Sequence, residues 1–196
     1  MKTELKFKGS RKYLHSTDFY TWFSAAVCDE NQIVTKLIFK QLIHCQCEVL
    51  LGQAAVGVEE NIVGAVQLLD KSNRESISGV IVETDTPVDE SYPFDEDKLV
   101  KDAEIISSQQ QATAFCRNDC TTVELVVALT KKLHNTLFNL NKGKWLVGQL
   151  NFCDELPIVY ERLSIKTTRM MQNKFSINDV MIDGKRFGTV QFIVGE

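Results

Sequence analysis

The sequence predicts an α+β protein made of two tandem copies of one unit, in which a long helix precedes several antiparallel strands. Each half of the 196-residue chain has one apolar helical segment, at residues 17–29 and 120–138. Alternating or β-branched runs follow both segments, as expected of strands. The chain is 44% hydrophobic, which suffices for a sizeable core. We therefore expect two long central helices packed on one continuous antiparallel sheet, a pseudo-dimer within one chain.

In the first half, the good N-cap residues at 16–18 precede an apolar run at 19–27, which predicts a buried helix. A short alternating segment at 5–14 comes before them. Strand patterns and turn residues follow, and they predict a strand over 33–51, a loop at 52–61, and a hairpin of 62–69 with 76–84 about a turn at 70–74.

The middle of the chain reads as an exposed connector. Residues 85–97 hold two of the three prolines and six carboxylates. We therefore expect a first repeat at 1–84, an acidic linker at 85–104 and a second repeat at 105–196.

The second half repeats the plan of the first. Asn118 and Asp119 are expected to cap a helix from Thr121 to about Phe138. Asp183 and Gly184 predict a hairpin turn. The expected strands are 105–115, 144–152, 160–168, 169–182 and 186–194.

A residue-level echo supports the repeat. Residues 36–45 align over residues 144–153 at a constant offset of 108 (144 − 36), with four identities in ten positions. In both halves the expected helix precedes this segment and strands follow it. The two segments are therefore predicted to be equivalent strands.

Composition excludes several classes of function. The 22 basic and 26 acidic residues are scattered, so no basic field for nucleic acid is expected. The first residues lack the apolar core of a signal peptide, and no stretch approaches the roughly 20 apolar residues of a membrane span. We expect a cytoplasmic protein whose six cysteines are reduced thiols.

A buried helix entered from a first strand and followed by a meandering antiparallel sheet is similar to the hot-dog fold, and two copies resemble its double form. The resemblance extends from about residue 5 to 194 and rests on the order of elements. It implies binding of acyl thioesters of coenzyme A or acyl carrier protein, with the thioester near a helix N-terminus. The family includes 3-hydroxyacyl dehydratases and acyl thioesterases, and a non-catalytic binding protein is the alternative.

The resemblance also implies site residues. In dehydratases a His ahead of one helix works with a carboxylate on the partner's helix. Segment 121–129 looks like the carboxylate-bearing helix, which gives Glu124 that role, and His15 is the one His just ahead of a helix. One composite site of His15 and Glu124 is thus implied. The further substrate-binding residues expected are Asp18, Phe19, Trp22, Asp119 and Val123.

The same residues have structural interpretations. Glu124 in a first turn offsets the helix dipole, and a His beside a strand end is often a hydrogen-bonded structural residue. Asp18 and Asp119 are expected to be N-caps. Cys120 near a helix N-terminus is a candidate nucleophile. No metal or other cofactor is expected, because the cysteines lack the spacing of a zinc site. A monomer or weak homodimer is expected.

Overall fold

The computed structural model describes residues 1–138, 140 and 142–195. The chain divides into two compact units, Met1–Phe94 and Asp95–Glu196. The division falls inside the segment expected to be a linker, 85–104. That segment contains the end of one strand, a two-residue strand, a short helix and the start of another strand. The coarse expectation of antiparallel sheets with a few helices is confirmed, and we describe each unit by itself.

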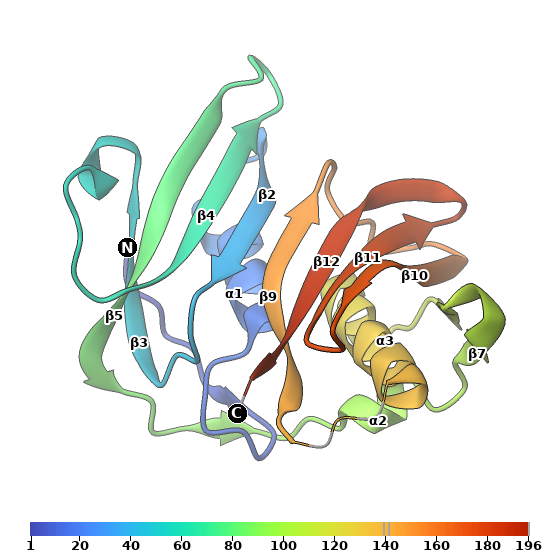
Figure 1. Ribbon diagram of the computed structural model, residues 1–196. Helices are drawn as coiled ribbons and strands as arrows, with labels where there is room; N and C mark the ends of the chain where they lie inside the picture. Colours follow the sequence, from blue (N-terminus) through green and yellow to red (C-terminus); the bar gives the residue numbers. More distant parts are fainter. Residues whose placement is uncertain (139, 141, 196) are drawn as a thin grey trace. The chain divides into compact units, whose positions relative to one another are not determined.

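Unit 1 has one short helix and a small antiparallel sheet (Figure 1). Its sheet has the strand order β3-β5-β4-β2, and β1 pairs with β6 in a separate parallel pair. Thr3 N donates to Cys47 O at 2.8 Å, so the first residues run beside β3. The elements are β1 (Phe7–Lys8), α1 (Ser16–Trp22), the π-helical turn η1 (Phe23–Val27), β2 (Gln32–Phe39), β3 (Cys45–Leu51), the 3₁₀ turn η2 (Gly52–Ala55), β4 (Ile62–Asp70), β5 (Ser76–Pro87) and β6 (Ser91–Tyr92).

The helix of unit 1 is shorter than predicted. α1 has seven residues, and its apolar run continues as the wider turn η1, in which Cys28 N donates to Phe23 O. Phe19 and Phe23 are fully buried, and the Phe19 ring lies 5.7 Å from that of Phe39 on β2. Residues 24–26 are exposed, so the run has no further apolar face to bury.

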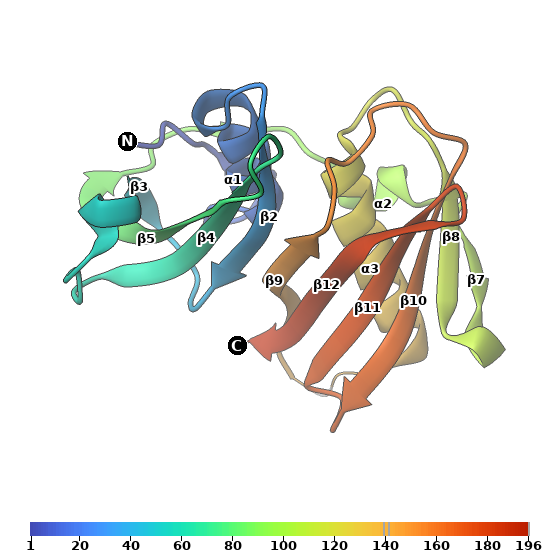
Figure 2. The same cartoon turned by 90° about the horizontal axis from the view of Figure 1, so that it is seen from above.

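Unit 2 has a long helix against a larger antiparallel sheet (Figure 2). Its strand order is β9-β12-β11-β10-β8-β7. With 16 residues, α3 is the one long helix in the part of the chain that the structure describes, so the expectation of two long helices is wrong. The elements are α2 (Glu96–Leu99), β7 (Glu104–Ile106), the 3₁₀ turn η3 (Ser107–Gln109), β8 (Gln111–Phe115), α3 (Thr122–Leu137), β9 (Lys144–Phe152), β10 (Arg162–Met171), β11 (Phe175–Ile182) and β12 (Lys185–Gly195).

The residue-level repeat is wrong, although the order of a helix followed by a strand holds in both units. Segment 144–153 is essentially β9 alone. Segment 36–45 instead spans the end of β2, the bend at 40–44 and the first residue of β3. The four identities at offset 108 therefore do not mark equivalent positions. That the two units are tandem copies of one structural unit, and that their sheets continue into one, stay predictions.

Several predicted boundaries also need correction. The segment at 5–14 forms only the two residues of β1, and the strand expected over 33–51 is broken by the bend at 40–44. The strand expected over 105–115 is interrupted by η3, and the break between β10 and β11 lies at 172–174. The hairpin of β4 with β5 and the turn at Asp183–Gly184 are confirmed. In the described residues no helix is both long and apolar enough for a membrane span.

Candidate functional site

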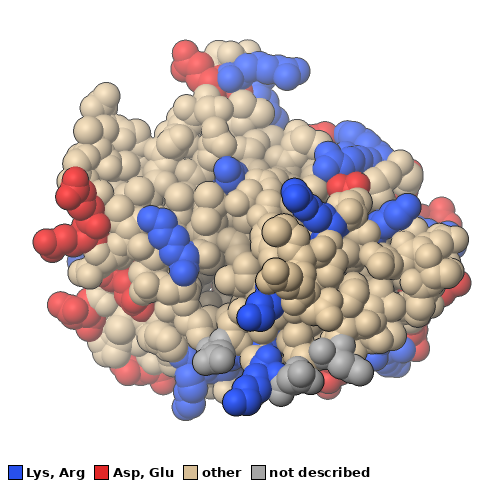
Figure 3. Space-filling model, viewed as in Figure 1, with Lys and Arg blue, Asp and Glu red and all other residues tan. Residues whose placement is uncertain are grey.

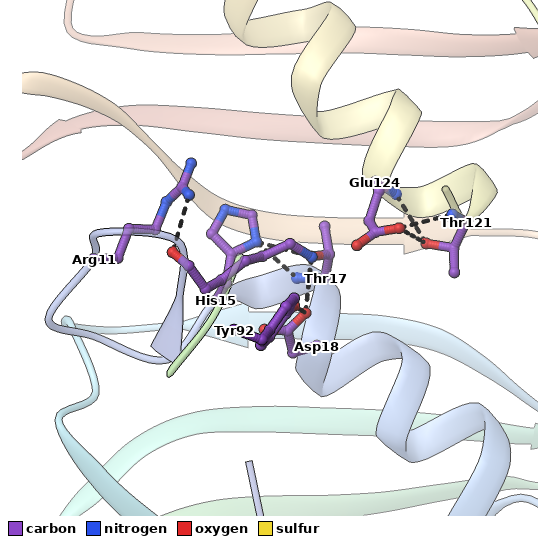
Figure 4. Close-up of polar contacts among 8 residues, drawn as sticks. Arg11, His15, Thr17, Asp18, Tyr92, Thr121 and Glu124 are labelled. Atoms are coloured by element: carbon purple, nitrogen blue, oxygen red, sulfur yellow. Dashed lines mark hydrogen bonds and ion pairs between the residues drawn. The ribbon is translucent and has the colours of Figure 1, made fainter. Parts of the chain in front are cut away.

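His15 is the N-cap of α1 (Figure 4). The helix begins at Ser16, earlier than the sequence suggested. The N-cap is therefore His15, and the prediction that Asp18 caps this helix is wrong. The His15 side chain is buried, and Nδ1 accepts from Thr17 N at 3.5 Å. The Thr17 hydroxyl lies 2.8 Å from the same nitrogen. The imidazole thus takes the place that a Ser or Asp side chain usually has at a helix start.

Asp18 belongs to a buried ionic cluster. Lys8 Nζ donates to Asp18 Oδ1 and to Thr17 Oγ1, both at 2.9 Å. Tyr92 OH donates to Asp18 Oδ1 at 2.8 Å (Figure 4). Pairing of β1 with β6 sets Lys8 beside Tyr92. Lys8 is fully buried, and Nζ also lies 4.2 Å from the ring centre of Phe94. A charge this deep is tolerated because it is paired and hydrogen-bonded.

One atom of this cluster has no partner. Asp18 Oδ2 is buried without a hydrogen bond, whereas Oδ1 accepts from both Lys8 and Tyr92. The negative charge of the carboxylate is therefore held by contacts to one oxygen, and the cluster fixes the start of α1 to the β1–β6 pair. Neither Lys8 nor Tyr92 was singled out from the sequence. Lys8 lies in a segment of alternating charge, which indicates an exposed face rather than a buried ammonium.

The two aromatic candidates of unit 1 are core residues. Phe19 is fully buried against Phe39. Trp22 is half-buried and meets the Phe23 ring edge-on, with 5.1 Å between ring centres. Both rings thus contribute to the packing of unit 1. Their use by a substrate stays a prediction.

Glu124 closes a capping box at the start of α3 (Figure 4). Thr121 N and Thr121 Oγ1 donate to Glu124 Oε2 at 2.7 and 2.9 Å, and Glu124 N donates to Thr121 Oγ1 at 3.3 Å. The N-cap is therefore Thr121, and the prediction that Asp119 caps this helix is wrong. The carboxylate is held by the backbone N–H and the hydroxyl of the N-cap residue, in agreement with a structural role at the helix start.

Asp119 and Val123 lie on either side of this cap. Asp119 forms a two-pronged ion pair with Arg117, at 2.8 Å for each contact, and these bonds lower the pKa of the Asp119 carboxyl. Val123 is buried in unit 2. Asp119 thus orders the loop before α3, and Val123 belongs to the core.

The thiol near the start of α3 is not activated. Burial raises the pKa of Cys120 to about 11, and the charges of Glu124 and Asp119 act in the same direction. The lowered thiol pKa on which the candidate nucleophile Cys120 depended is therefore absent, and the thiol stays protonated at neutral pH. Burial likewise raises the pKa of Cys47 to about 12. Among the described residues no group of three or more His, Cys, Asp or Glu side chains is arranged to hold a metal ion.

A second buried polar group lies under α3. His134 Nε2 and Asn178 Oδ1 are 3.0 Å apart, and Thr167 Oγ1 donates to the same oxygen at 2.8 Å. Burial lowers the pKa of His134 to about 4. His134 was not considered from the sequence, although its spacing from the apolar residues at 126, 127 and 133 places it on the buried face of the helix.

Each unit also has a surface hollow of about 450 Å³. The hollow of unit 1 lies between the N-terminal residues 2–6, Gln46 and the end of β5, and that of unit 2 lies over the strands β8, β10 and β11. Neither is lined by a candidate residue. On the face in Figure 3, Lys and Arg side chains are spread out rather than gathered into one field.

Comparisons with known proteins find similar structures and no similar sequence. No protein-family model and no curated protein matches the chain. The dehydratase domain of PpsC from Mycobacterium tuberculosis, in complex with C12:1-CoA, is 10% identical, with a TM-score of 0.47 over 93% of this chain and 85% of that domain. A pyran synthase domain from module nine of the sorangicin pathway is 10% identical, with a TM-score of 0.49 over 97% and 92% of the two chains.

An acyl-ACP thioesterase from Bacteroides thetaiotaomicron is 9% identical, with a TM-score of 0.44 over 100% of this chain and 97% of that one. At these identities and TM-scores the likeness assigns neither a substrate nor a reaction to this chain.

Proposed function

We propose that the chain is a tandem hot-dog protein that binds an acyl thioester of coenzyme A or acyl carrier protein. One observation carries the proposal. His15 and Glu124 both lie at the start of the helix of their unit, His15 as the N-cap of α1 and Glu124 as the third residue of α3, and each is fixed there by hydrogen bonds. Two pre-ordered polar side chains at corresponding helix starts are what a composite ligand site in a pseudo-dimer requires.

The start of α3 has backbone N–H groups that suit binding of a carbonyl oxygen. In any α-helix the first N–H groups have no intrahelical acceptor, and here the capping box uses those of Thr121 and Glu124. The N–H groups of Thr122 and Val123 are not part of the capping box, and we propose that they face the thioester oxygen. Such donors stabilise negative charge on a carbonyl oxygen, as oxyanion sites do.

Binding is the leading function, because both candidate side chains already have structural roles as caps. Dehydration of a 3-hydroxyacyl thioester is the second candidate, and it is supported by the fixed carboxylate of Glu124 next to the helix N–H groups. In that reaction Glu124 would handle the hydroxyl and His15 the proton. Thioester hydrolysis, with a carboxylate activating water, is the third.

The proposal extends to the organisation of the chain. We propose two repeats at 1–84 and 105–196, with Asp18, Phe19, Trp22, Asp119 and Val123 around the ligand, in a cytoplasmic monomer or weak homodimer. Light scattering over a range of protein concentrations tests the last point. An obligate hexamer would contradict it.

Calorimetric titration with an acyl-CoA analogue, in which a thioether replaces the thioester, tests the binding function. We expect saturable binding for at least one acyl chain of a C4–C16 series, and no saturation with free coenzyme A. Absence of binding across the series, presented on coenzyme A and on acyl carrier protein, would refute the proposal.

Glu124→Gln separates the binding function from the enzymatic one, because it keeps the shape and removes the charge. If the protein is a dehydratase, turnover of a 3-hydroxyacyl-CoA should fall by about 10² or more while the affinity for the analogue changes little. Thr136→Ala, on the exposed side of the same helix, is the matched control. Wild-type binding without turnover would leave binding as the function.

A double-mutant cycle tests whether His15 and Glu124 serve the same ligand. His15→Ala, Glu124→Gln and the double variant are compared by their affinity for the analogue. Groups that face one ligand should give non-additive losses, whereas independent roles should add. Additive losses would contradict the composite site and would mean that the ligand is bound by one unit.

A further inference from the structure

One end of unit 2 carries exposed apolar side chains. Ile158 and Val159, on the loop between β9 and β10, are 88% and 85% exposed. Phe115, the last residue of β8, is 61% exposed. They are three of the six large apolar side chains that are exposed in the described part of the chain. Single exposed apolar residues are common, whereas neighbouring ones mark a contact surface. We call these three residues the apolar tip of unit 2.

Hydrogen bonds show that the residues of the apolar tip are neighbours. Cys116 N donates to Glu161 O at 3.2 Å, and Cys116 Sγ donates to Ile158 O at 3.6 Å. Thr122 Oγ1 donates to Pro157 O at 2.6 Å. Figure 2 shows the β9–β10 loop and the segment that leads into α3 beyond the ends of the strands of unit 2. The loop is therefore fixed to the rest of its unit while its side chains stay exposed.

The backbone of the apolar tip is already hydrogen-bonded. Pro157 has no N–H group, and its carbonyl oxygen accepts from Thr122. The carbonyl oxygen of Ile158 accepts from Cys116. Backbone groups that leave water for lipid are costly unless they are bonded within the protein. These bonds remove that cost at residues 157 and 158, and they order the loop before any contact is made.

The size of the apolar tip favours a membrane over a protein partner. Its three side chains expose on the order of 300 Å² of apolar surface. A stable protein interface buries about 800 Å² on each partner, so the tip is too small to form one by itself. Binding to a membrane has no such threshold, because its strength grows with each apolar group that is inserted.

The charges around the apolar tip are mixed. Segments 115–121 and 153–162 carry two basic and four acidic side chains. Arg117 is paired with a carboxylate of its own loop at 2.8 Å. Arg162 lies over the ring of Phe115, with 5.7 Å between Cζ and the ring centre. These segments therefore offer no basic field to anionic headgroups, and a contact with lipid has to come from the apolar side chains.

We propose that the apolar tip of unit 2 inserts into the headgroup region of a zwitterionic lipid membrane and so docks the protein there reversibly. The loop needs no rearrangement, because it is already ordered by its hydrogen bonds to the segment before α3 and to Thr122. The inference goes beyond the proposed function and does not depend on it, because the lipid contact involves no acyl thioester.

Flotation of the protein with phosphatidylcholine vesicles tests the proposal. We expect the wild-type protein to rise with the vesicles. Ile158→Ser and Val159→Ser should each lower the partition coefficient by about tenfold, because each removes most of the apolar surface of one inserted side chain. Val56→Ser is the matched control, since Val56 is a 72% exposed apolar side chain of unit 1, and it should leave partitioning unchanged.

Val159→Trp tests the same contact by gain of binding. The larger apolar ring should raise the partition coefficient, and its fluorescence should shift to the blue when vesicles are added. Val56→Trp should do neither. Thermal unfolding should be nearly unchanged in all these variants, because every substituted side chain is exposed.

Lipid composition separates apolar insertion from electrostatic attraction. Replacing part of the phosphatidylcholine with phosphatidylglycerol should not increase binding, and added salt should change it little. Binding that needs the anionic lipid and is lost in salt would overturn the proposal.

Three further outcomes would overturn the proposal. The first is a wild-type protein that does not float with phosphatidylcholine vesicles. The second is an equal loss in Ile158→Ser and Val56→Ser. The third is self-association of the wild-type protein that Ile158→Ser abolishes and that vesicles do not displace, which would assign the apolar tip to a second copy of this chain. None of these results bears on the binding of an acyl-CoA analogue, which is measured without vesicles.

Discussion

The two units place their strands in different orders after the helix. In unit 2 the strand after the helix, β9, pairs with the last strand, β12, and β10, β11 and β12 follow one another as neighbours. In unit 1 the corresponding strand, β2, pairs with β4, and β5 lies between β4 and β3. The connections explain the difference. β10 and β11 are joined by three residues, which forces them to be neighbours, whereas ten residues between β3 and β4 allow the chain to cross over.

The units also differ in the polar groups that they bury. Unit 1 buries an ion pair at the start of its short helix, Lys8 with Asp18. Unit 2 buries a neutral imidazole near the end of its long helix, His134 with Asn178. A seven-residue helix has little apolar face, and an ion pair ties its first turn to the β1–β6 pair. The comparison teaches that the short helix is anchored by a buried ion pair, whereas the long helix is anchored by a buried hydrogen bond between neutral groups.

Removing the buried ammonium should have the largest effect. Lys8→Met leaves the Asp18 carboxylate buried without its cation, and we expect the free energy of unfolding of unit 1 to fall by about 3–5 kcal/mol. Chemical denaturation followed by NMR of both units measures it. Lys185→Met, which breaks the exposed pair with Asp154, is the control and should change nothing measurable. Equal effects would contradict the role given to the buried pair.

Acid should destabilise unit 2 through His134. The usual pKa of 6.5 applies in the unfolded chain, whereas the folded pKa is about 4. Between these values the unfolded state binds more protons, so stability is fully present above pH 6.5 and is lost as the pH falls toward 4, by roughly 3 kcal/mol in total. His134→Gln should remove this part of the pH dependence in denaturant titrations. Identical slopes for both proteins would show that His134 is already protonated or exposed.

A glycine in β4 tests the unusual strand order of unit 1. A Cβ at Gly64 would lie 2.5 Å from Ile38 O on β2 and 3.2 Å from a side-chain carbon of Ile81 on β5. Because β4 lies between these two strands, Gly64→Ala should cost about 1–3 kcal/mol. Ser78→Ala, at an exposed position of β5, is the control. A neutral Gly64→Ala would contradict the close packing of β4 between β2 and β5.

The smallest expected effect concerns the cap of α3. Thr121→Ala removes the side chain that accepts from Glu124 N and should cost about 1 kcal/mol in unit 2. Thr136→Ala, near the other end of the same helix, should change stability by only a few tenths of a kcal/mol. Thermal unfolding distinguishes them. A silent Thr121→Ala would mean that Glu124 is held by something other than the capping box.

Much of the fold could be predicted from local pattern. The strand at 144–152, the hairpin of β4 with β5 and the turn at Asp183–Gly184 follow from alternation and turn residues alone. The strand order of unit 1 could not be predicted, because it depends on which edge β4 meets after a long loop. The length of α1 also escaped prediction, since the exposure of residues 24–26 depends on tertiary packing.

The candidate site was predictable only in part. The position of Glu124 in a first turn follows from the Thr121–Glu124 spacing of a capping box. The role of His15 as a cap was missed because Asp18 is the better N-cap residue by type, yet Asp18 is taken by Lys8 and Tyr92. Those partners come from residues 8 and 92, and no local pattern connects them.

One titration tests the central claim, that the starts of both helices face one acyl-thioester ligand. Amide chemical shifts of the labelled protein are followed as the acyl-CoA thioether analogue is added. The account predicts that the amides of residues 15–18 and 121–124 shift together, with one dissociation constant, while those of the two surface hollows do not. Shifts confined to one unit, or two unrelated dissociation constants, would contradict it.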